Sequence, residues 1–373
     1  MLRVAGIRGL GPGRWISAAL RRPGPDPGPG HSRPPPPSPA WRGALTRPTV
    51  RPRSGAAEAQ RAAAAALLAA LGIFQRGEKP TEAEDQIILL IKHAKLSAIK
   101  GELEDAERFL HQALHLAQQS QHNQAITYIY CQMANLAFLR GDLLSAEKLF
   151  KASMSQLLGS GAQQDDNALI EMSLKLCSIY ASTERDNLAV EGYKWCIETL
   201  EEKIRREKAT PEEGLSAEEM ENMQLLLGMS LDSCARYMLI RGQLLLATGM
   251  YEKALAIAQD VHGETHPQTV VLMNDLATVL ERRDNHQQAH KLAKRASSLA
   301  REIAHPDLPA ILSNEAAIHA HTGNYTEARQ LYKEALEEAN TQGNERLIER
   351  IREAMEELDA RTRSSRDKGE ERQ

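Results

Sequence analysis

The sequence predicts an all-α fold, an α-solenoid of six helical hairpins with a C-terminal capping helix. Three observations lead to this prediction. Aromatic residues make up only 4% of the chain and hydrophobic residues 42%, which favours helices packed through Ala and Leu. A helical pattern built on alanines recurs six times, and a second small residue precedes each copy at a constant distance. Together these features predict a repeated pair of helices.

Residues 1–60 precede the repeats and are too rich in Pro and Arg to build a packed core. They hold ten Arg, no Lys and two acids, a balance of +8. The first stretch, MLRVAGIRGLGPGRWISAALRR, contains no acid, and this Arg-rich pattern is typical of a mitochondrial presequence. The sequence therefore predicts a disordered presequence over 1–60. A plain disordered basic tail is the alternative, because the glycines of this stretch weaken the helix that a presequence forms.

Residues 61–84 combine an apolar segment with an acidic joint. The apolar part, AAAAALLAALGIF over 62–74, has 13 residues, fewer than the roughly 18 to 20 that span a bilayer as a helix. It is compatible with a short membrane anchor, a sorting signal held in the inner membrane, or an Ala-rich helix outside the membrane. The sequence leaves these three alternatives open.

Residues 85–340 hold the six predicted repeats. In each copy two small residues lie seven apart. A bulky residue lies between them in five copies, as Leu110 does between Ala106 and Ala113, and Ala293 replaces it in the fifth copy. The first alanines of successive copies are Ala106, Ala146, Ala189, Ala247, Ala289 and Ala328, at intervals of 40, 43, 58, 42 and 39 residues. Six aligned copies predict six supersecondary units of one kind.

A second small residue lies twelve positions before each first alanine: Ala94, Ala134, Cys177, Ala235, Ala277 and Ala316. It predicts a first helix in each unit, packed closely against the second helix where both side chains are small. Glycine occupies the turn between the helices in four copies, while Glu184 and Asp284 replace it in the third and fifth. These two units are expected to be the least stable.

Three further segments complete the predicted organisation. An insertion at 198–222 accounts for the long interval, and its first half is expected to extend a helix as far as Pro211. Residues 341–360 have apolar residues on one helical face and predict a capping helix. Residues 361–373 contain no apolar side chain and are expected to be a disordered tail. Asp165 and Asp166 are expected to cap the helix that starts near Ala168.

The small residue of the first helix, the turn glycine and the Ala, Tyr or Phe, Ala pattern of the second helix together resemble the tetratricopeptide repeat family. The stretch GETHPQTVVLMNDLATVL over 263–280 resembles the longer units of kinesin light chains. Over its whole length the chain resembles a mitochondrial branch of the family, through DNALIEMSLKLCSIYA, LEEKIRREK, LLLGMSLDSCARY and GETHPQTVVLMNDLAT. That resemblance implies a mitochondrial inner-membrane protein that assists assembly or maintenance of respiratory complex III, the cytochrome bc1 complex.

The partner-binding groove is expected along the first helices, which line the concave side of such arrays. Side chains next to the small positions, or one turn away, mix apolar and polar groups, which suits an extended peptide or a partner helix. The residues expected to contact the partner are Lys95, Tyr128, Asn135, Phe138, Ser178, Asp232, Arg236, Asn274 and Thr278. Chaperone adaptors of this family grip a carboxylate with Lys, Asn and Arg, but Ile91, Cys131 and Leu174 leave that clamp incomplete here.

Other kinds of function are disfavoured. Residues 61–373 carry 36 basic and 48 acidic residues, which disfavours nucleic acid because phosphate binding needs clustered Lys and Arg. The catalytic and nucleotide-binding motifs G-x-G-x-x-G, G-x-x-x-x-G-K-[ST], G-x-S-x-G and H-E-x-x-H are missing, so no enzyme activity and no cofactor are expected. The four cysteines are widely spaced and are expected to be free core thiols.

Three histidine pairs are candidate metal ligands: His111 with His115, His286 with His290, and His262 with His266. None has further ligands placed by the sequence, so no metal is expected. The sequence leaves two other hypotheses open. One is a cytosolic adaptor of the kinesin-light-chain type, and the other is an enzyme that uses the histidine pairs.

Overall fold

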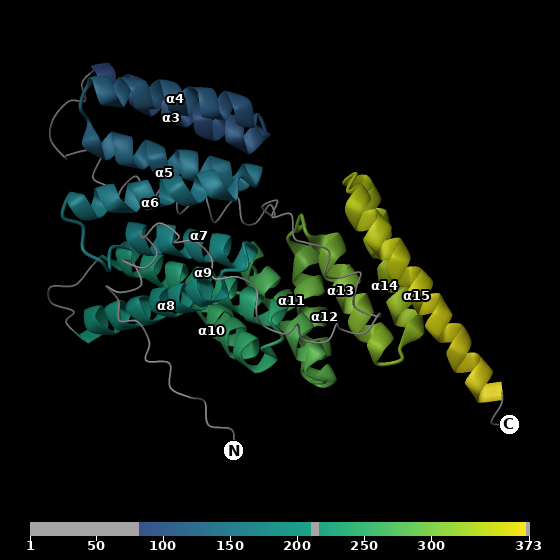
Figure 1. Cartoon of the computed structure of the whole chain (residues 1–373). Coiled ribbons are helices and arrows are strands. Elements are labelled where there is room, and N and C mark those ends of the chain that lie inside the picture. Colours follow the sequence, from purple (N-terminus) through teal and green to yellow (C-terminus); the bar gives the residue numbers. More distant parts are fainter. Residues whose placement is uncertain (1–81, 210–215, 371–373) are drawn as a thin grey trace, which may run out of the picture. The chain divides into compact units, whose positions relative to one another are not determined.

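The computed structural model describes residues 82–209 and 216–370, where all regular structure is helical (Figure 1). The thirteen helices of this part are α3 (Glu82–Lys100), α4 (Leu103–Gln119), α5 (Asn123–Arg140), α6 (Leu143–Gly159), α7 (Asn167–Ser182), α8 (Asp186–Ala209), α9 (Ala217–Ile240), α10 (Leu244–His262), α11 (Pro267–Arg282), α12 (His286–Glu302), α13 (Leu308–His321), α14 (Tyr325–Thr341) and α15 (Glu345–Glu370). The predicted presequence over 1–60, the apolar segment over 62–74 and Pro211 lie outside the described residues.

The helices form six successive hairpins, from α3 and α4 to α13 and α14, followed by α15, so the all-α solenoid prediction is confirmed. The described chain divides into two compact units, one ending at Ser230 and the other beginning at Leu231 within α9. In each unit a second helix also packs against the first helix of the next hairpin, as α4 does on α5 and α12 on α13. Across the described ranges, none of the helices combines the length and apolar character needed to cross a membrane.

The small residues predicted at the helix crossings are all buried. In the first helices Ala94 is 3% exposed and Ala134, Cys177, Ala235, Ala277 and Ala316 are at most 1% exposed. In the second helices the six predicted first alanines are likewise at most 1% exposed. A larger side chain here would separate the paired helices, because interhelical distance depends on the side chains at the contact. The bulky residues predicted between them, such as Phe150 and Tyr251, are buried as well.

Each turn between paired helices contains a residue in the left-handed backbone conformation, and this residue is not always glycine. Gly141 has φ of +79°, and its successor Asp142 donates its backbone N–H to Ala137 O at 2.9 Å. Glu184 takes the same role in the third hairpin with φ of +59°, and the backbone N–H of Arg185 donates to Tyr180 O at 2.9 Å. A side chain with a Cβ raises the energy of this conformation.

The insertion lengthens the third and fourth hairpins. Helix α8 continues through Ala209, as predicted. Its second half is tied to the loop before α7 and to the first residue of α7, because Lys203 Nζ donates to Asp165 O at 2.8 Å and to Asn167 Oδ1 at 3.0 Å. Helix α9 begins with a capping box, in which the N–H of Glu219 donates to Ser216 Oγ and the N–H of Ser216 donates to the Glu219 carboxylate. Asp166 caps α7 as predicted, accepting from the N–H of Ala168 at 2.8 Å.

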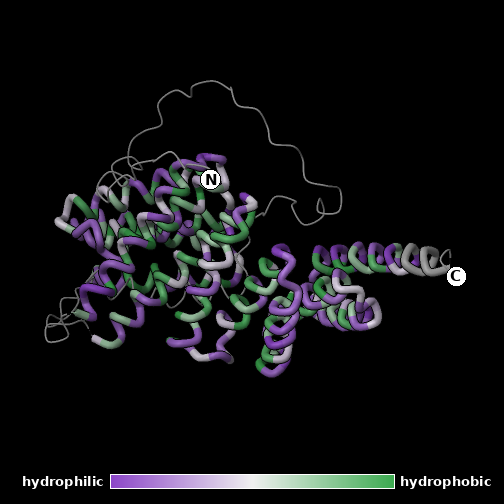
Figure 2. The backbone as a smooth tube through the Cα atoms, turned by 90° about the horizontal axis from the view of Figure 1, so that it is seen from below, coloured by the Kyte–Doolittle hydropathy of each residue, from purple (hydrophilic) through white to green (hydrophobic). Residues whose placement is uncertain are grey.

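Helix α15 covers the last hairpin of the second unit. Ile348, Ile351 and Leu358 are at most 3% exposed and pack in one cluster with Tyr332 and other residues of α13 and α14. Hydrophilic residues dominate the coloured part of the helix that leads to the C-terminus (Figure 2). This arrangement fits the predicted capping helix.

The predicted disorder of 361–373 is wrong as far as Glu370, because α15 continues to that residue. The prediction relied on the lack of apolar residues. Arg361 instead pairs with Glu357 at 2.7 Å one turn earlier, and Thr362 Oγ1 donates to Leu358 O at 2.8 Å. Such pairs, three or four residues apart, support an exposed helix without apolar burial.

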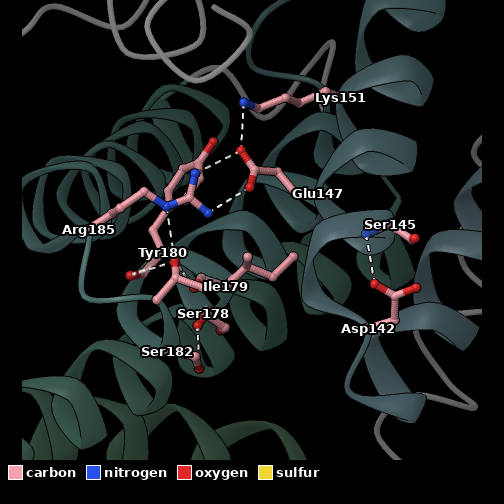
Figure 3. Close-up of polar contacts among 10 residues, drawn as sticks. Asp142, Ser145, Glu147, Lys151, Ser178, Ile179, Tyr180, Ser182 and Arg185 are labelled. Carbon is pink, nitrogen blue, oxygen red and sulfur yellow. Dashed lines mark hydrogen bonds and ion pairs between the residues drawn. The ribbon is translucent and has the colours of Figure 1, made fainter. Parts of the chain in front are cut away.

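A buried ion cluster joins the second and third hairpins (Figure 3). Glu147 on α6 is 7% exposed, and Arg185, before α8, donates to both of its carboxylate oxygens at 2.9 and 2.6 Å. Lys151 Nζ lies 2.7 Å from the same carboxylate, and the Arg185 guanidinium lies 4.5 Å from the centroid of the Tyr180 ring. Burial acts to raise the pKa of Glu147, but the hydrogen bonds from Arg185 and Lys151 outweigh it, so that pKa lies below its usual value.

We predict that Glu147→Gln lowers the free energy of unfolding by about 2–3 kcal/mol, because it leaves two half-buried cations without their acid. Urea unfolding monitored by circular dichroism measures this change. The matched control is Glu107→Gln. Glu107 pairs with Arg140 of the next hairpin, and the two side chains are 44% and 34% exposed, respectively. Because this pair is more exposed, the substitution should lower the free energy of unfolding by less than about 1 kcal/mol. Equal losses in the two variants would contradict the proposed role of burial.

The same pair has a defined pH dependence. Since the folded pKa of Glu147 is depressed, its contribution is complete above the ordinary value of 4.5 and is lost as the pH falls through the lower folded value. The stability difference between wild type and Glu147→Gln should therefore be constant near neutral pH and shrink in acid.

We predict that Glu184→Gly raises the free energy of unfolding by about 0.5–1 kcal/mol, because glycine adopts positive φ without the Cβ penalty. Gly141→Ala should lower it by about 1 kcal/mol. An added Cβ at Gly141 has no atom within 4 Å, so its cost reflects φ alone. Thermal and urea unfolding check both values, and stabilisation by Gly141→Ala would contradict the argument.

Candidate functional site

The candidate site is the side of the first helices that carries the predicted binding residues, which we call the first-helix face. Helix α3 contacts α5 in the first unit, and α11 contacts α13 in the second, so first helices of neighbouring hairpins lie next to each other. Each unit therefore presents its own part of the face. In the first unit it is formed by α3, α5 and α7, and in the second by residues 231–240 of α9 together with α11 and α13.

In the first unit, Lys95 and Tyr128 form a stacked pair across α3 and α5. The Lys95 ammonium lies 5.4 Å from the centroid of the Tyr128 ring, a cation–π contact. Lys95 is half-buried, and this burial lowers the pKa of its ammonium group. The nearby Cys131 thiol has a smaller effect that raises the same pKa. Tyr128 is completely buried rather than open to a partner as predicted, and its hydroxyl has no hydrogen-bond partner among the described residues. The Tyr128 ring therefore lies beneath Lys95 and supports it.

The remaining predicted residues of α5 follow one another along the helix. Asn135 is half-buried, and its Nδ2 lies 3.9 Å from Cys131 Sγ, at the limit of a weak hydrogen bond. Phe138 is also half-buried and remains available for contact. Burial, reinforced by Glu171, raises the pKa of the Cys131 thiol to about 12, so this thiol stays neutral at physiological pH. A neutral buried thiol is a packing group and a poor nucleophile.

Ser178 on α7 turns toward its own hairpin. Its Oγ donates to Leu174 O at 3.2 Å and lies 3.3 Å from Tyr193 Oη on α8. These contacts link the first helix to the second within the third hairpin. Ser178 therefore presents only a half-buried side chain on the face.

In the second unit, the predicted residues belong to one polar network. Arg236 forms ion pairs with Asp232 on its own helix and, at 3.5 Å, with Asp275 on α11. The pKa of Arg236 is raised mainly by the negative charge of Asp232. Burial acts to lower this pKa, and the charge of Asp275 acts to raise it further. Arg236 keeps 40% of its side chain exposed, whereas Asp232 and Asn274 are buried, at 8% and 5% exposed. Burial of these two residues contradicts their expected availability to a partner.

The network continues to the next hairpin. Asn274 Nδ2 donates to Asp275 Oδ1 at 3.3 Å, and Asn314 Nδ2 on α13 donates to Asn274 Oδ1 at 3.0 Å. Thr278 donates to Asn274 O at 3.0 Å and is half-buried. The buried members thus hold the first helices in register, and Arg236 and Thr278 are the members that remain accessible.

The histidine pairs have structural surroundings. His286 and His321 lie 3.0 and 3.1 Å from the two oxygens of buried Glu281, which raises the pKa of His286 through its hydrogen bond and charge. His266 caps α11 and its ring stacks on His262 with centroids 4.1 Å apart. His111 and His115 are exposed on α4. Residues 82–209 and 216–370 contain no group of three or more His, Cys, Asp or Glu arranged to hold a metal ion.

Several residues of the face were missed by the sequence prediction. Glu171 and Lys175 on α7 lie close enough to Cys131 to shift its pKa, and Asp275 and Asn314 complete the network of the second unit. A signal for Glu171 was present. It lies six positions before the small residue Cys177, as Tyr128 lies six before Ala134. Inspection of the position equivalent to Tyr128 in every repeat identifies Glu171.

Comparisons with known proteins agree with the fold. Two family profiles described as tetratricopeptide repeat match residues 235–302 and 310–339. The apo form of RapI superposes with a TM-score of 0.53 at 14% identity, covering 76% of this chain and 72% of that one. A Rap protein complexed with competence and sporulation factor gives a TM-score of 0.50 at 11% identity, covering 80% and 81%. At these identities the likeness concerns the fold alone.

Sequence relatives are much closer. Tetratricopeptide repeat protein 19, mitochondrial, from Homo sapiens is 54% identical over 282 residues, which cover 76% of this chain and 74% of the relative. The Rattus norvegicus protein of the same name is 53% identical over 306 residues, covering 80% of this chain and 84% of the relative. The homologue from Drosophila melanogaster is 23% identical over 226 residues, covering 61% and 58%. The chain belongs to the tetratricopeptide repeat protein 19 family.

Proposed function

We propose that the chain is a non-enzymatic protein-binding scaffold of the mitochondrial inner membrane that assists assembly or maintenance of respiratory complex III. In this proposal the first-helix face binds a complex III subunit or a fragment of one. The observation that carries the binding part is the composition of the face in each unit. In the first unit half-buried Phe138 accompanies half-buried Lys95 and Asn135, and in the second unit half-buried Thr278 accompanies Arg236, whose side chain is 40% exposed. Such a mixture suits an extended peptide, because apolar contacts supply affinity and a few polar groups fix its position.

Two further observations support the location and the absence of catalysis. The acid-free leader and the mitochondrial names of the relatives favour import into mitochondria. The polar groups of the second unit's face are used in a network between helices, and the Cys131 thiol is neutral, which fits a scaffold better than an enzyme. The complex III assignment rests on the family resemblance.

We predict that cells contain a processed form shorter than the full 41.3 kDa chain, and that this form is in the mitochondria. The reason is that an imported presequence is removed by proteolysis. Subcellular fractionation, followed by intact-mass measurement of the purified protein, tests this. Recovery of the intact chain in the cytosol contradicts the mitochondrial proposal and favours the cytosolic adaptor.

We predict that Asn135→Ala combined with Phe138→Ala reduces recovery of complex III subunits at least about fivefold in affinity purification from mitochondria. The two side chains lie half-buried on the first-helix face, and truncating contacts inside an interface typically costs 1 kcal/mol or more when they matter. Quantitative mass spectrometry measures the recovery.

The matched control is Gln112→Ala combined with Ser155→Ala, which changes exposed residues on the second helices α4 and α6. It should leave recovery unchanged. Thermal unfolding of both variants separates loss of binding from loss of folding. Equal recovery with a folded Asn135→Ala and Phe138→Ala variant excludes this part of the face.

A further inference from the structure

Helix α3, in the first hairpin of the first unit (Figure 1), has large apolar side chains that are exposed. Leu89 is 52% exposed, Leu96 50% and Ile99 56%. Leu89 and Leu96 lie seven residues apart, or about two helical turns, and so share one face of α3. The ends of a repeat array normally present polar faces, because no neighbouring repeat covers them. An apolar face at this position therefore fits a surface that another element covers.

The positions of Leu89 and Leu96 are buried in later first helices. Leu89 lies five residues before the small residue Ala94, and Leu96 lies two residues after it. In α5, α7, α11 and α13 the residues at these two positions are at most 5% exposed. They are Ile129 and Leu136, Met172 and Ile179, Leu272 and Val279, and Ile311 and Ile318.

The cover of these later helices comes from the preceding hairpin. Helix α4 packs on α5, α6 on α7, α10 on α11 and α12 on α13, so in each case a second helix lies against the next first helix. Within the described residues, no helix precedes α3. Leu89 and Leu96 therefore lack the kind of neighbour that buries their equivalents.

The repeat pattern continues in the sequence before α3. Ala63, Leu67 and Ala70 have the spacing of the second helices, with a bulky residue four positions and a small residue seven positions after the first alanine. Within 62–74 this is the one register that places a bulky residue between two small ones. Ala63 lies 43 residues before Ala106, which is also the interval between the first alanines of the second and third repeats. Residues 62–74 thus occupy the place of a second helix in the period.

We propose that residues 62–74 form a helix that packs on α3 and covers Leu89 and Leu96, as the second helix of a half repeat. In this arrangement Leu67 takes the place of Leu110 on α4, which is 3% exposed. The seven residues between this helix and α3 are sufficient for the connection, because the link between α6 and α7 has the same length.

The dimensions favour this occupant over a bilayer. Thirteen apolar residues are fewer than the roughly 18 to 20 that span a membrane as a helix. A helix of that length extends about 20 Å and covers Leu89 and Leu96, which are separated by about 10 Å along α3. The inference goes beyond the proposed function and does not depend on it, since residues 62–74 cover α3 whichever partner the first-helix face binds.

The first test measures thiol labelling in the purified full chain. Leu89→Cys and, separately, Leu96→Cys each introduce one thiol on the apolar face of α3, whereas the four native cysteines are at most 6% exposed. Each new thiol should react with a maleimide at least about tenfold more slowly than Leu144→Cys, because a covered side chain reacts only when its cover opens. Leu144 is the control, since it is 70% exposed on α6.

Substitutions of two adjacent leucines test the register of the covering helix. Leu67→Glu places a charge against α3 and should raise the labelling rate of Leu96→Cys about tenfold, because it removes the cover. Leu68→Glu is the matched control and should leave that rate unchanged. The residues equivalent to Leu68 in five of the six repeats are exposed and polar: His111, Lys194, Glu252, Lys294 and Lys333.

Hydrogen exchange of the unsubstituted chain provides a second measurement. An isolated helix of about 13 residues is marginally stable in water, so it protects its amides little unless it packs against another element. The amides of 62–74 should exchange at least about tenfold more slowly than in the urea-unfolded chain. Leu67→Glu should abolish this protection, and Leu68→Glu should retain it.

The proposal is overturned if Leu96→Cys reacts as fast as Leu144→Cys, or if Leu67→Glu and Leu68→Glu have equal effects in folded variants. Thermal unfolding establishes that each variant is folded. Protection of Leu96→Cys that requires vesicles of phosphatidylcholine and cardiolipin would assign the apolar face to a membrane. Protection that rises with protein concentration would assign it to a second copy. Either result, or a processed form that begins after residue 74, rejects the half repeat.

Discussion

Close approach of paired helices at small side chains is the constraint on which the described fold depends. Ala134 on the first helix and Ala146 on the second are both completely buried, and equivalent small residues recur in every hairpin. Because the helices approach closely there, longer residues such as Phe150 and Tyr251 are directed into the contact with neighbouring elements. Each hairpin buries its apolar surface only with its neighbours, which is the physical basis of a repeat array.

Polar groups within these contacts fix how neighbouring hairpins are aligned. Glu147 binds cations from two segments, Lys151 on its own helix and Arg185 at the turn of the next hairpin. In the second unit Glu281 has the same role, with His286 on α12 and His321 on α13. Apolar contacts between helices tolerate sliding, whereas a buried carboxylate with two donors defines one position. The two carboxylates thus add specificity to an interface built on alanine.

The first-helix face has a different character in the two units. In the second unit most polar groups are already engaged, since ion pairs and a hydrogen bond join Asp232, Arg236, Asp275 and Asn274. In the first unit Lys95 rests on a buried ring and has no acidic partner within the described residues. Polar groups that are paired within the fold maintain its geometry. Polar groups that lack partners can gain hydrogen bonds or ion pairs when another molecule binds. In the proposed function, the first unit is therefore the part of the face where a protein ligand would gain most.

The helical hairpins could be predicted from the amino-acid sequence, because the signals that specify them are local. These signals are the spacing of small residues, the turn glycine and the Asp166 cap, and each acts within about 30 residues. Because a helix has a fixed period, the spacing shows which residues share one face of each helix. The tail after Arg361 was the exception, since the prediction counted apolar residues and overlooked charge pairs such as Glu357 with Arg361. The accessibility of the predicted site residues, by contrast, depends on packing between repeats and became known from the structure. Tyr128, Asp232 and Asn274 have the correct helical position, but they are covered by neighbours such as Lys95 and Asn314 that lie 33 to 40 residues away in sequence. Burial of a side chain depends on contacts between repeats, and a single sequence does not specify how long side chains from separate repeats arrange around one another.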